Sequence, residues 1–171
     1  MPTRKPALLR AVFVAITGIL AVGVVGCTAV TSPSDRATHL TSGGRHTCAP
    51  GSSVQLDGQS GLFVITGACG AITVHGDGLT VRLERAASLA VEGQSASITV
   101  EDRVGSAMIK GNGISLTADS IGSVQITGQS NSITAPALGS VMVQGDHNAV
   151  RTHLKPSDYR VTGQDDTLTL E

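Results

Sequence analysis

The chain has 171 residues, of which only 2% are aromatic and 15% are charged, and its formal net charge at pH 7 is −1. This length suggests a single domain, and a core with so few aromatic residues must consist of Val, Ile, Leu and Ala. The near-neutral charge offers no electrostatic attraction to phosphate backbones, so we do not expect nucleic acid as a partner.

Residues 1–26 have the pattern of an export signal. Three basic residues precede an uncharged, mostly apolar run over residues 11–25. The run is short for a helix that spans a membrane, and a basic start followed by such a run is typical of a signal peptide. The alternatives are an uncleaved anchor and an ordinary secretory signal.

The apolar run ends in a motif for lipid attachment. Val24-Val25-Gly26-Cys27 resembles the lipobox of bacterial lipoproteins. The resemblance implies cleavage before Cys27, which would then carry a diacylglyceryl thioether and hold the exported protein on the outer side of the cell membrane. Removal of the signal would leave nine basic and thirteen acidic residues, a net charge of −4.

Residues 27–47 are rich in Ser, Thr and Gly and show no apolar periodicity. Such a composition predicts a flexible tether rather than a packed segment. We therefore expect the folded domain to cover residues 48–171.

A glycine recurs through this domain at steps of 18, 17, 18, 17, 17 and 18 residues. Regular self-similarity of this kind indicates a repeat architecture. We expect each glycine at a corner where φ is positive or where successive backbones approach closely. The corner glycines are Gly58, Gly76, Gly93, Gly111, Gly128, Gly145 and Gly163.

Apolar residues stand four and two positions before each corner glycine, and five and seven positions after it. Around Gly128, for example, they are Val124/Ile126 and Ile133/Ala135. Alternation with period two predicts two short strands per copy, each apolar on its inward face.

A single copy cannot bury these faces, so the copies must stack as parallel strands. The predicted fold is an all-β parallel β-solenoid of about seven coils. A left-handed hexapeptide helix would repeat an apolar residue every six positions, which this chain does not, so we favour right-handed winding.

Two cysteines remain if Cys27 is lipidated. Cys48 precedes the first coil, and Cys69 lies between the first coil and the second. Because an exported protein can keep cysteines oxidised, we expect a Cys48–Cys69 disulfide that fixes the preceding segment over the open end of the solenoid. The alternatives are two free thiols and a metal pair, and the latter lacks further ligands.

Taken together, the lipobox, the tether, the two cysteines and the Gly-x-x-Asn-x-[Val/Ile] turns resemble an actinobacterial, chiefly mycobacterial, lipoprotein family called domain of unknown function 3060. The resemblance covers about residues 48–153 and is carried best by Gly128-Gln129-Ser130-Asn131-Ser132-Ile133 and Gly145-Asp146-His147-Asn148-Ala149-Val150. It implies a repeat fold and a location in the cell envelope, but it supplies no activity, substrate or catalytic residue. In the other coils the turn asparagine is replaced by Gly61, Leu79, Ala96, Ile114 or Asp166.

The repeat frame brings no catalytic or metal-binding group together. The acidic residues form no cluster on any face, so we expect no acid–base catalysis. The histidines follow no metal-ligand spacing, and we expect neither a metal nor another cofactor. The five histidines are His39, His46, His75, His147 and His153.

One position after each corner glycine, the residues are mainly amides. Stacked Gln and Asn can hydrogen-bond from coil to coil, which predicts a structural side-chain amide ladder. Its members are Gln59, Asp77, Gln94, Asn112, Gln129, Asp146 and Gln164.

Three successive coils carry Ser-x-Thr at the outward positions four and six residues after the glycine. Repetition in register predicts a flat hydroxyl array with about 4.8 Å between coils. Thr is also a good strand residue on any solvent-facing surface, which is the structural alternative to a binding role. We name these six residues the hydroxyl face: Ser97, Thr99, Ser115, Thr117, Ser132 and Thr134.

Two functions fit these observations. The leading hypothesis is a lipid-anchored, non-enzymatic binding or structural module of the cell envelope, with an envelope glycan or protein as its partner. The alternative is a carbohydrate-active enzyme on the same scaffold, which would need two carboxylates within about 5–10 Å. The repeat frame places no such pair.

Overall fold

The computed structural model describes residues 37–171, and the predicted signal peptide, Cys27 and the first part of the predicted tether lie outside this range. In the described part of the chain, all regular structure is β, and no helix is long and apolar enough to cross a membrane. The strands are β1 (Thr38–Leu40), β2 (Gly44–Thr47), β3 (Val54–Gln59), β4 (Leu62–Asp77), β5 (Thr80–Gln94), β6 (Ser97–Asn112), β7 (Ser115–Thr127), β8 (Ser132–Thr134), β9 (Ala137–Gln144), β10 (Ala149–Thr152), β11 (Asp158–Thr162) and β12 (Thr167–Leu170).

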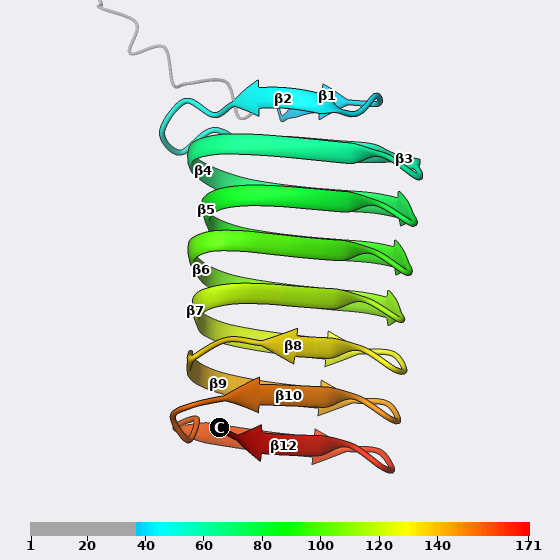
Figure 1. Ribbon diagram of the computed structural model, residues 1–171, viewed down its shortest axis with the longest axis vertical. Coiled ribbons are helices and arrows are strands. Elements are labelled where there is room, and N and C mark those ends of the chain that lie inside the picture. Colours follow the sequence, from blue (N-terminus) through cyan, green and yellow to red (C-terminus); the bar gives the residue numbers. More distant parts are fainter. Residues whose placement is uncertain (1–36) are drawn as a thin grey trace, which may run out of the picture. The chain divides into compact units, whose positions relative to one another are not determined.

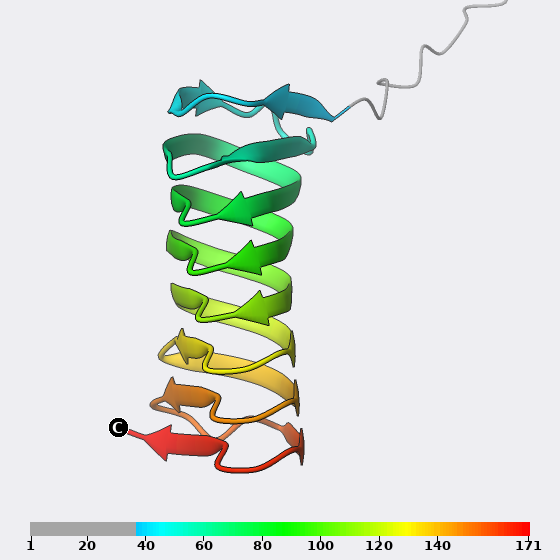
Figure 2. The same ribbon diagram turned by 90° about the vertical axis from the view of Figure 1, so that its right-hand side faces the viewer.

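Every strand pairing is parallel, and each coil pairs with the coil before and after it. Figure 1 shows the coils stacked along one axis, and Figure 2 shows the same stack from the side of the corners. In Figure 1 the chain runs leftward in front through β8, β10 and β12, returns rightward behind, and descends, which is right-handed winding. The predicted parallel β-solenoid of about seven coils is confirmed.

The core is the set of inward columns that the repeat frame predicts. In the first six coils both inward pairs are buried; around Gly128, for example, Ile126 and Ile133 are completely inaccessible. The seventh coil keeps the same frame, but Val161 and Leu170 are exposed because no further coil covers them. Burial therefore follows from stacking and not from the motif alone.

The structure also has a third inward column, which the prediction of two short strands per coil missed. Strands β4 to β7 do not stop after the second apolar pair but continue through a bend, so that another small or aliphatic side chain enters the core. These side chains are Cys69, Ala86, Val104, Ile121 and Leu138, each at most 5% exposed. The coil thus has three walls.

The bend accounts for the two coil lengths. The pairing of β4 with β5 shifts register between Ile65 and Ala68, and that of β5 with β6 shifts between Leu83 and Ala86. An extra residue at the bend turns a 17-residue step into an 18-residue step, whereas the two strands beside the corner keep constant register.

Five of the seven corner glycines have positive φ, and all except Gly58 lie too close to the coil before for a Cβ to fit. Gly93 has φ +150°, and a Cβ built on it would collide with the carbonyl oxygen of Gly76 in the coil before. A second left-handed position, which we did not predict, lies two residues after each corner glycine and is occupied by Ser60, Gly78, Ser95, Gly113, Ser130, His147 and Asp165, with φ between 54° and 66°.

The predicted tether over residues 27–47 is wrong from Thr38 onward. Strand β1 pairs with β3, and β2 pairs with β4, so the two strands form an additional N-terminal rung. The residues of this rung are mainly polar, and only Leu40 in β1 and β2 packs against the core. The rung therefore shows no apolar periodicity in the sequence.

The predicted disulfide is present. Cys48 and Cys69 are bonded, with 5.3 Å between their Cα atoms. Cys48 lies at the end of the N-terminal rung and continues the third inward column above Cys69. The bond therefore fixes this rung to the first coil.

Candidate ligand-binding faces

The six residues of the hydroxyl face lie on one side of the solenoid in exact rows, as the repeat frame predicts. Ser97 pairs with Ser115 and then Ser132, and Thr99 pairs with Thr117 and then Thr134. None of these six hydroxyls hydrogen-bonds to another side chain of residues 37–171, so they face solvent. Arg82 and Arg151 flank this face along the threonine row.

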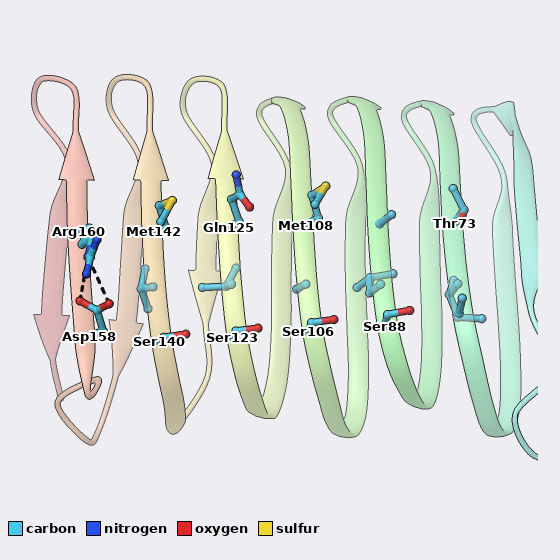
Figure 3. A pocket seen from close by; sticks show the side chains of 17 residues that line it. Thr73, Ser88, Ser106, Met108, Ser123, Gln125, Ser140, Met142, Asp158 and Arg160 are labelled. Carbon is cyan, nitrogen blue, oxygen red and sulfur yellow. Dashed lines mark hydrogen bonds and ion pairs between the residues drawn. The ribbon is translucent and has the colours of Figure 1, made fainter.

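The opposite side of the coil carries a groove of about 370 Å³. Its floor contains one serine from each of four successive coils, and Figure 3 shows their hydroxyls in a single line along the solenoid axis. These serines stand five residues before a corner glycine, within β5, β6, β7 and β9. We call the site the serine groove and its floor residues Ser88, Ser106, Ser123 and Ser140.

Residues two positions further along each strand form one wall of the serine groove. Met108 and Met142 are 41% and 38% exposed, which is unusual for methionine, and Gln125 lies between them in the stack. At the C-terminal end, Nε of Arg160 lies 3.3 Å from the carboxylate of Asp158 (Figure 3). The groove thus combines a hydroxyl floor with an amphipathic wall.

The lining of the serine groove has one acidic and one basic side chain, and its other polar groups are hydroxyls and one amide. Asp158 is its one carboxylate, and Arg160 neutralises it, so the lining lacks the pair of acids that glycoside hydrolysis needs. No histidine lines the groove to activate a serine. The repeated groups can donate and accept hydrogen bonds but have no partner for acid–base work.

Our reading of the sequence missed this groove. Four successive serines at one repeat position are visible in the sequence, but the concavity beside them is not.

Five side chains form a row in which basic and acidic residues alternate, on the corner side of the same wall. His39 and His75 contact Asp57 through their Nδ1 atoms, at 3.4 and 3.3 Å. Nε2 of His75 lies 3.2 Å from Glu92, and Lys110 reaches the other oxygen of Glu92 at the same distance. We call this row the charge ladder; it connects β1 to β6 through five rungs.

Two carboxyl groups of the charge ladder have perturbed acidity. The side-chain hydrogen bond from Gln55 is the main cause that lowers the pKa of Asp57, with further lowering by His75 and His39. The hydrogen bond from Lys110 and its positive charge lower the pKa of Glu92. The ionised forms are therefore the ones that the folded protein stabilises.

The turn asparagines of the family motif are buried and structural. Oδ1 of Asn131 accepts the backbone N–H of Ile114 at 2.9 Å, and Oδ1 of Asn148 accepts the N–H of Asn131 at 3.0 Å. Asp166 ends the row by accepting from Asn148. We call Asn131, Asn148 and Asp166 the asparagine ladder, and it closes the corners of the last coils.

The predicted amide ladder is only partly correct. The short side chains of Asp77, Asn112 and Asp146 each accept the backbone N–H of the glutamine in the next coil, at 2.8 to 2.9 Å. The described residues make no side-chain-to-side-chain amide bond in this column. A short acceptor reaches the neighbouring backbone, whereas glutamine is too long to do so.

A larger groove of about 860 Å³ follows the bend. Its floor contains Gly70, Gly105, Gly122 and Gly139, where a Cβ would collide with a carbonyl oxygen of the coil before. Close stacking therefore sets its shape. Arg85 and Arg103 hold the same repeat position in two successive coils of this groove, and Arg85 is already paired with Asp102 at 3.1 Å.

Residues 37–171 contain no group of three or more His, Cys, Asp and Glu side chains that could hold a metal ion. The histidines of the charge ladder contact single carboxylates in a row and do not converge on one point. We therefore assign no metal site to this part of the chain.

Comparison with known proteins gives one match. A family model described as "Protein of unknown function (DUF3060)" matches residues 56–113, a shorter stretch than the resemblance covered, and one that excludes both asparagine motifs. No curated protein matches the chain, and no solved structure matches it. The family description names no activity. The matched stretch, from β3 to the corner after β6, is similar to the DUF3060 family.

Proposed function

We propose that this protein is a lipid-anchored, non-enzymatic binding module of the cell envelope and that it binds its ligand in the serine groove. The observation that carries the proposal is the row of four serine hydroxyls, one per coil, on the floor of a concave face. A concave site with a few repeated polar groups is the usual form of a ligand-binding surface.

The groove is preferred over the hydroxyl face because it encloses a ligand from more than one side. A ligand in a groove loses more contact with water and gains more contact area than one on a flat sheet. The hydroxyl face has good strand residues on a solvent-facing surface, which needs no ligand to explain it.

The location is supported by the sequence of residues 1–27. A basic start, an apolar run and the lipobox occur in order and end at Cys27. Two acyl chains on this cysteine would anchor the protein stably, since a single chain gives only marginal binding.

The anchor is tested by expressing the full chain with Cys27→Ser and measuring the mass of the product and its distribution between membrane and soluble fractions. We expect the parent protein to carry the acyl mass and to sediment with membranes, and the variant to lack that mass. Equal masses, apart from the substituted atom, would refute lipidation at Cys27.

The groove is tested with two matched tryptophan variants of the same coil. Ser123→Trp fills the centre of the serine groove, while Ser115→Trp places the same side chain on the hydroxyl face. Full-length protein is purified in detergent and bound to the isolated envelope of the producing cells. We expect Ser123→Trp to abolish retention and Ser115→Trp to leave it unchanged. The reverse result would transfer the binding site to the hydroxyl face.

A further inference from the structure

From the spacing of groups in the serine groove we infer that its ligand is a neutral, unbranched, β-linked glycan chain lying along the solenoid axis. This inference rests on the proposed function, because it names the ligand of the same groove. It is drawn from three properties of the lining: its length, its two periods and its charge.

The groove crosses six strands, from Ala71 in β4 to Asp158 in β11. Five intervals of one rung each give a length of about 24 Å. Its volume of about 370 Å³ is small for this length, so the groove admits one extended chain and not a globular surface.

The lining repeats with two periods. The floor presents one serine hydroxyl per rung, which is a spacing of about 4.8 Å. The column beside the serines consists of Thr73, Ala90, Met108, Gln125, Met142 and Arg160, and its last four members alternate between apolar and polar side chains. Met108 and Met142 therefore lie two rungs apart, and so do Gln125 and Arg160.

A β-linked glycan has both periods. Each sugar presents hydroxyls at every unit, and successive sugars are turned over, so the pattern of apolar ring faces and polar edges repeats every second unit. Two rungs cover about 10 Å, which is close to one disaccharide of an extended β-linked chain. The groove therefore accommodates about five sugars.

Two other extended ligands fit less well. A peptide strand presents same-face side chains about 6.7 Å apart, which falls out of step with the rungs after one repeat. An acyl chain would cover four serine hydroxyls without offering them a hydrogen bond, and burying polar groups without partners is unfavourable.

The charge of the lining selects a neutral chain. Asp158 and Arg160 are its one acid and its one base, and they are paired with each other at 3.3 Å. Neither is left to attract an ionic ligand. The domain as a whole is acidic, which also disfavours a polyanion.

The test uses calorimetric titration of the full-length protein in detergent with defined oligosaccharides. Chitopentaose and cellopentaose are the β-linked probes, cellobiose tests the dependence on length, and maltopentaose is the α-linked control. We expect at least one β-linked pentasaccharide to bind, with about tenfold or greater preference over cellobiose and over maltopentaose.

Groove variants make the assignment specific. Replacing Ser106, Ser123 and Ser140 together by Ala should weaken binding of the pentasaccharide about tenfold or more, because three hydroxyl hydrogen bonds are lost. The matched control replaces Thr99, Thr117 and Thr134 by Val on the opposite face and should leave affinity unchanged. Both variants should melt as the parent does.

Three outcomes would overturn the inference: no binding of either β-linked pentasaccharide at millimolar concentration, equal binding of maltopentaose, or unchanged affinity in the serine variant. These outcomes are separable from failure of the proposed function. If Ser123→Trp still abolishes retention on the envelope, the groove is the binding site and only the ligand class is wrong.

Discussion

Neighbouring side chains in the strands that precede the corner glycines have opposite environments. Residues two and four positions before the glycine point into the core, and those three and five positions before it point outward. Ile126 is completely buried, and Gln125 beside it is exposed. The difference in burial is large because an inward side chain packs against the equivalent side chains of the coils on both sides.

We expect Ile126→Asp to lower the free energy of unfolding by several kcal/mol, because it buries a carboxylate without a partner in the middle of the core. Gln125→Asp should change it by less than about 0.5 kcal/mol, as is usual for exposed positions. Thermal and urea denaturation of both variants measure the difference. Similar losses in the two variants would contradict the assignment of inward and outward faces.

Asn131 is a buried polar residue whose side chain hydrogen-bonds to three groups in neighbouring coils. Asn131→Leu should lower the free energy of unfolding by about 1–3 kcal/mol, because the N–H of Ile114 loses its acceptor in a buried corner. The exposed neighbour Gln129 provides a control, since Gln129→Leu removes no side-chain hydrogen bond. Amide exchange at Ile114 should quicken in the first variant alone.

At the scale of strands, the charge ladder joins rungs that backbone pairing already holds in register. Its carboxylates have lowered pKa values, so its contribution to stability is complete above the ordinary values of 3.8 for Asp57 and 4.5 for Glu92. The contribution is lost as the pH falls through the lower values of the folded protein. Salt should weaken it, because its side chains are one-third exposed or more.

Glu92→Gln should therefore lower the melting temperature at pH 5.5 and have a smaller effect at pH 2.5, where the parent protein has lost the same contribution. Glu101→Gln is the matched control, because Glu101 is exposed and makes no ion pair within residues 37–171. If Glu92→Gln lowers the melting temperature equally at the two pH values, the ionised carboxylate of the charge ladder is not the source of the stability that the variant loses.

At the scale of the whole molecule, the disulfide determines whether the N-terminal rung stays on the stack. The bond closes a loop with a sequence separation of 21 residues, and the chain-entropy model assigns about 3 kcal/mol to a loop of this size. The rung itself is short and has few apolar contacts, which predicts local opening without the bond.

Replacing Cys48 and Cys69 by Ala should therefore abolish protection from hydrogen exchange in β1 and β2 and leave β7 protected. Exchange measured by mass spectrometry on the folded variant reports both regions in one experiment. Unchanged protection of β1 and β2 would mean that strand pairing alone holds the rung in place.

The sequence was sufficient to predict the parts of the fold that repeat at constant spacing from the corner glycine. The inward pairs, the corners and the hydroxyl face were placed correctly because β-pairing keeps those strands in register. The third wall was not predicted because its residues do not stand at a constant distance from the corner glycine. Ala86 lies ten residues after its glycine and Val104 eleven, since the length of the bend varies from coil to coil. The N-terminal rung escaped because His39 and His46 occupy strand positions that lack an apolar pattern.

The serine groove could be predicted in composition but not in shape. Ser106, Ser123 and Ser140 share one repeat position, and this much is visible in the sequence. Whether a row of serines lies on a flat face or in a hollow depends on the angle between two walls, and no single residue encodes that angle.

Because the strands beside the corners keep constant register, one coil can be duplicated as a complete structural unit. Residues 112–128 are one complete coil of seventeen residues between two corner glycines, and each coil contacts mainly its neighbours. An in-frame duplication of these seventeen codons would add a rung without disturbing either end, and it would copy Ser123 and Gln125 with it. The length of the groove can thus change by whole rungs in one genetic step.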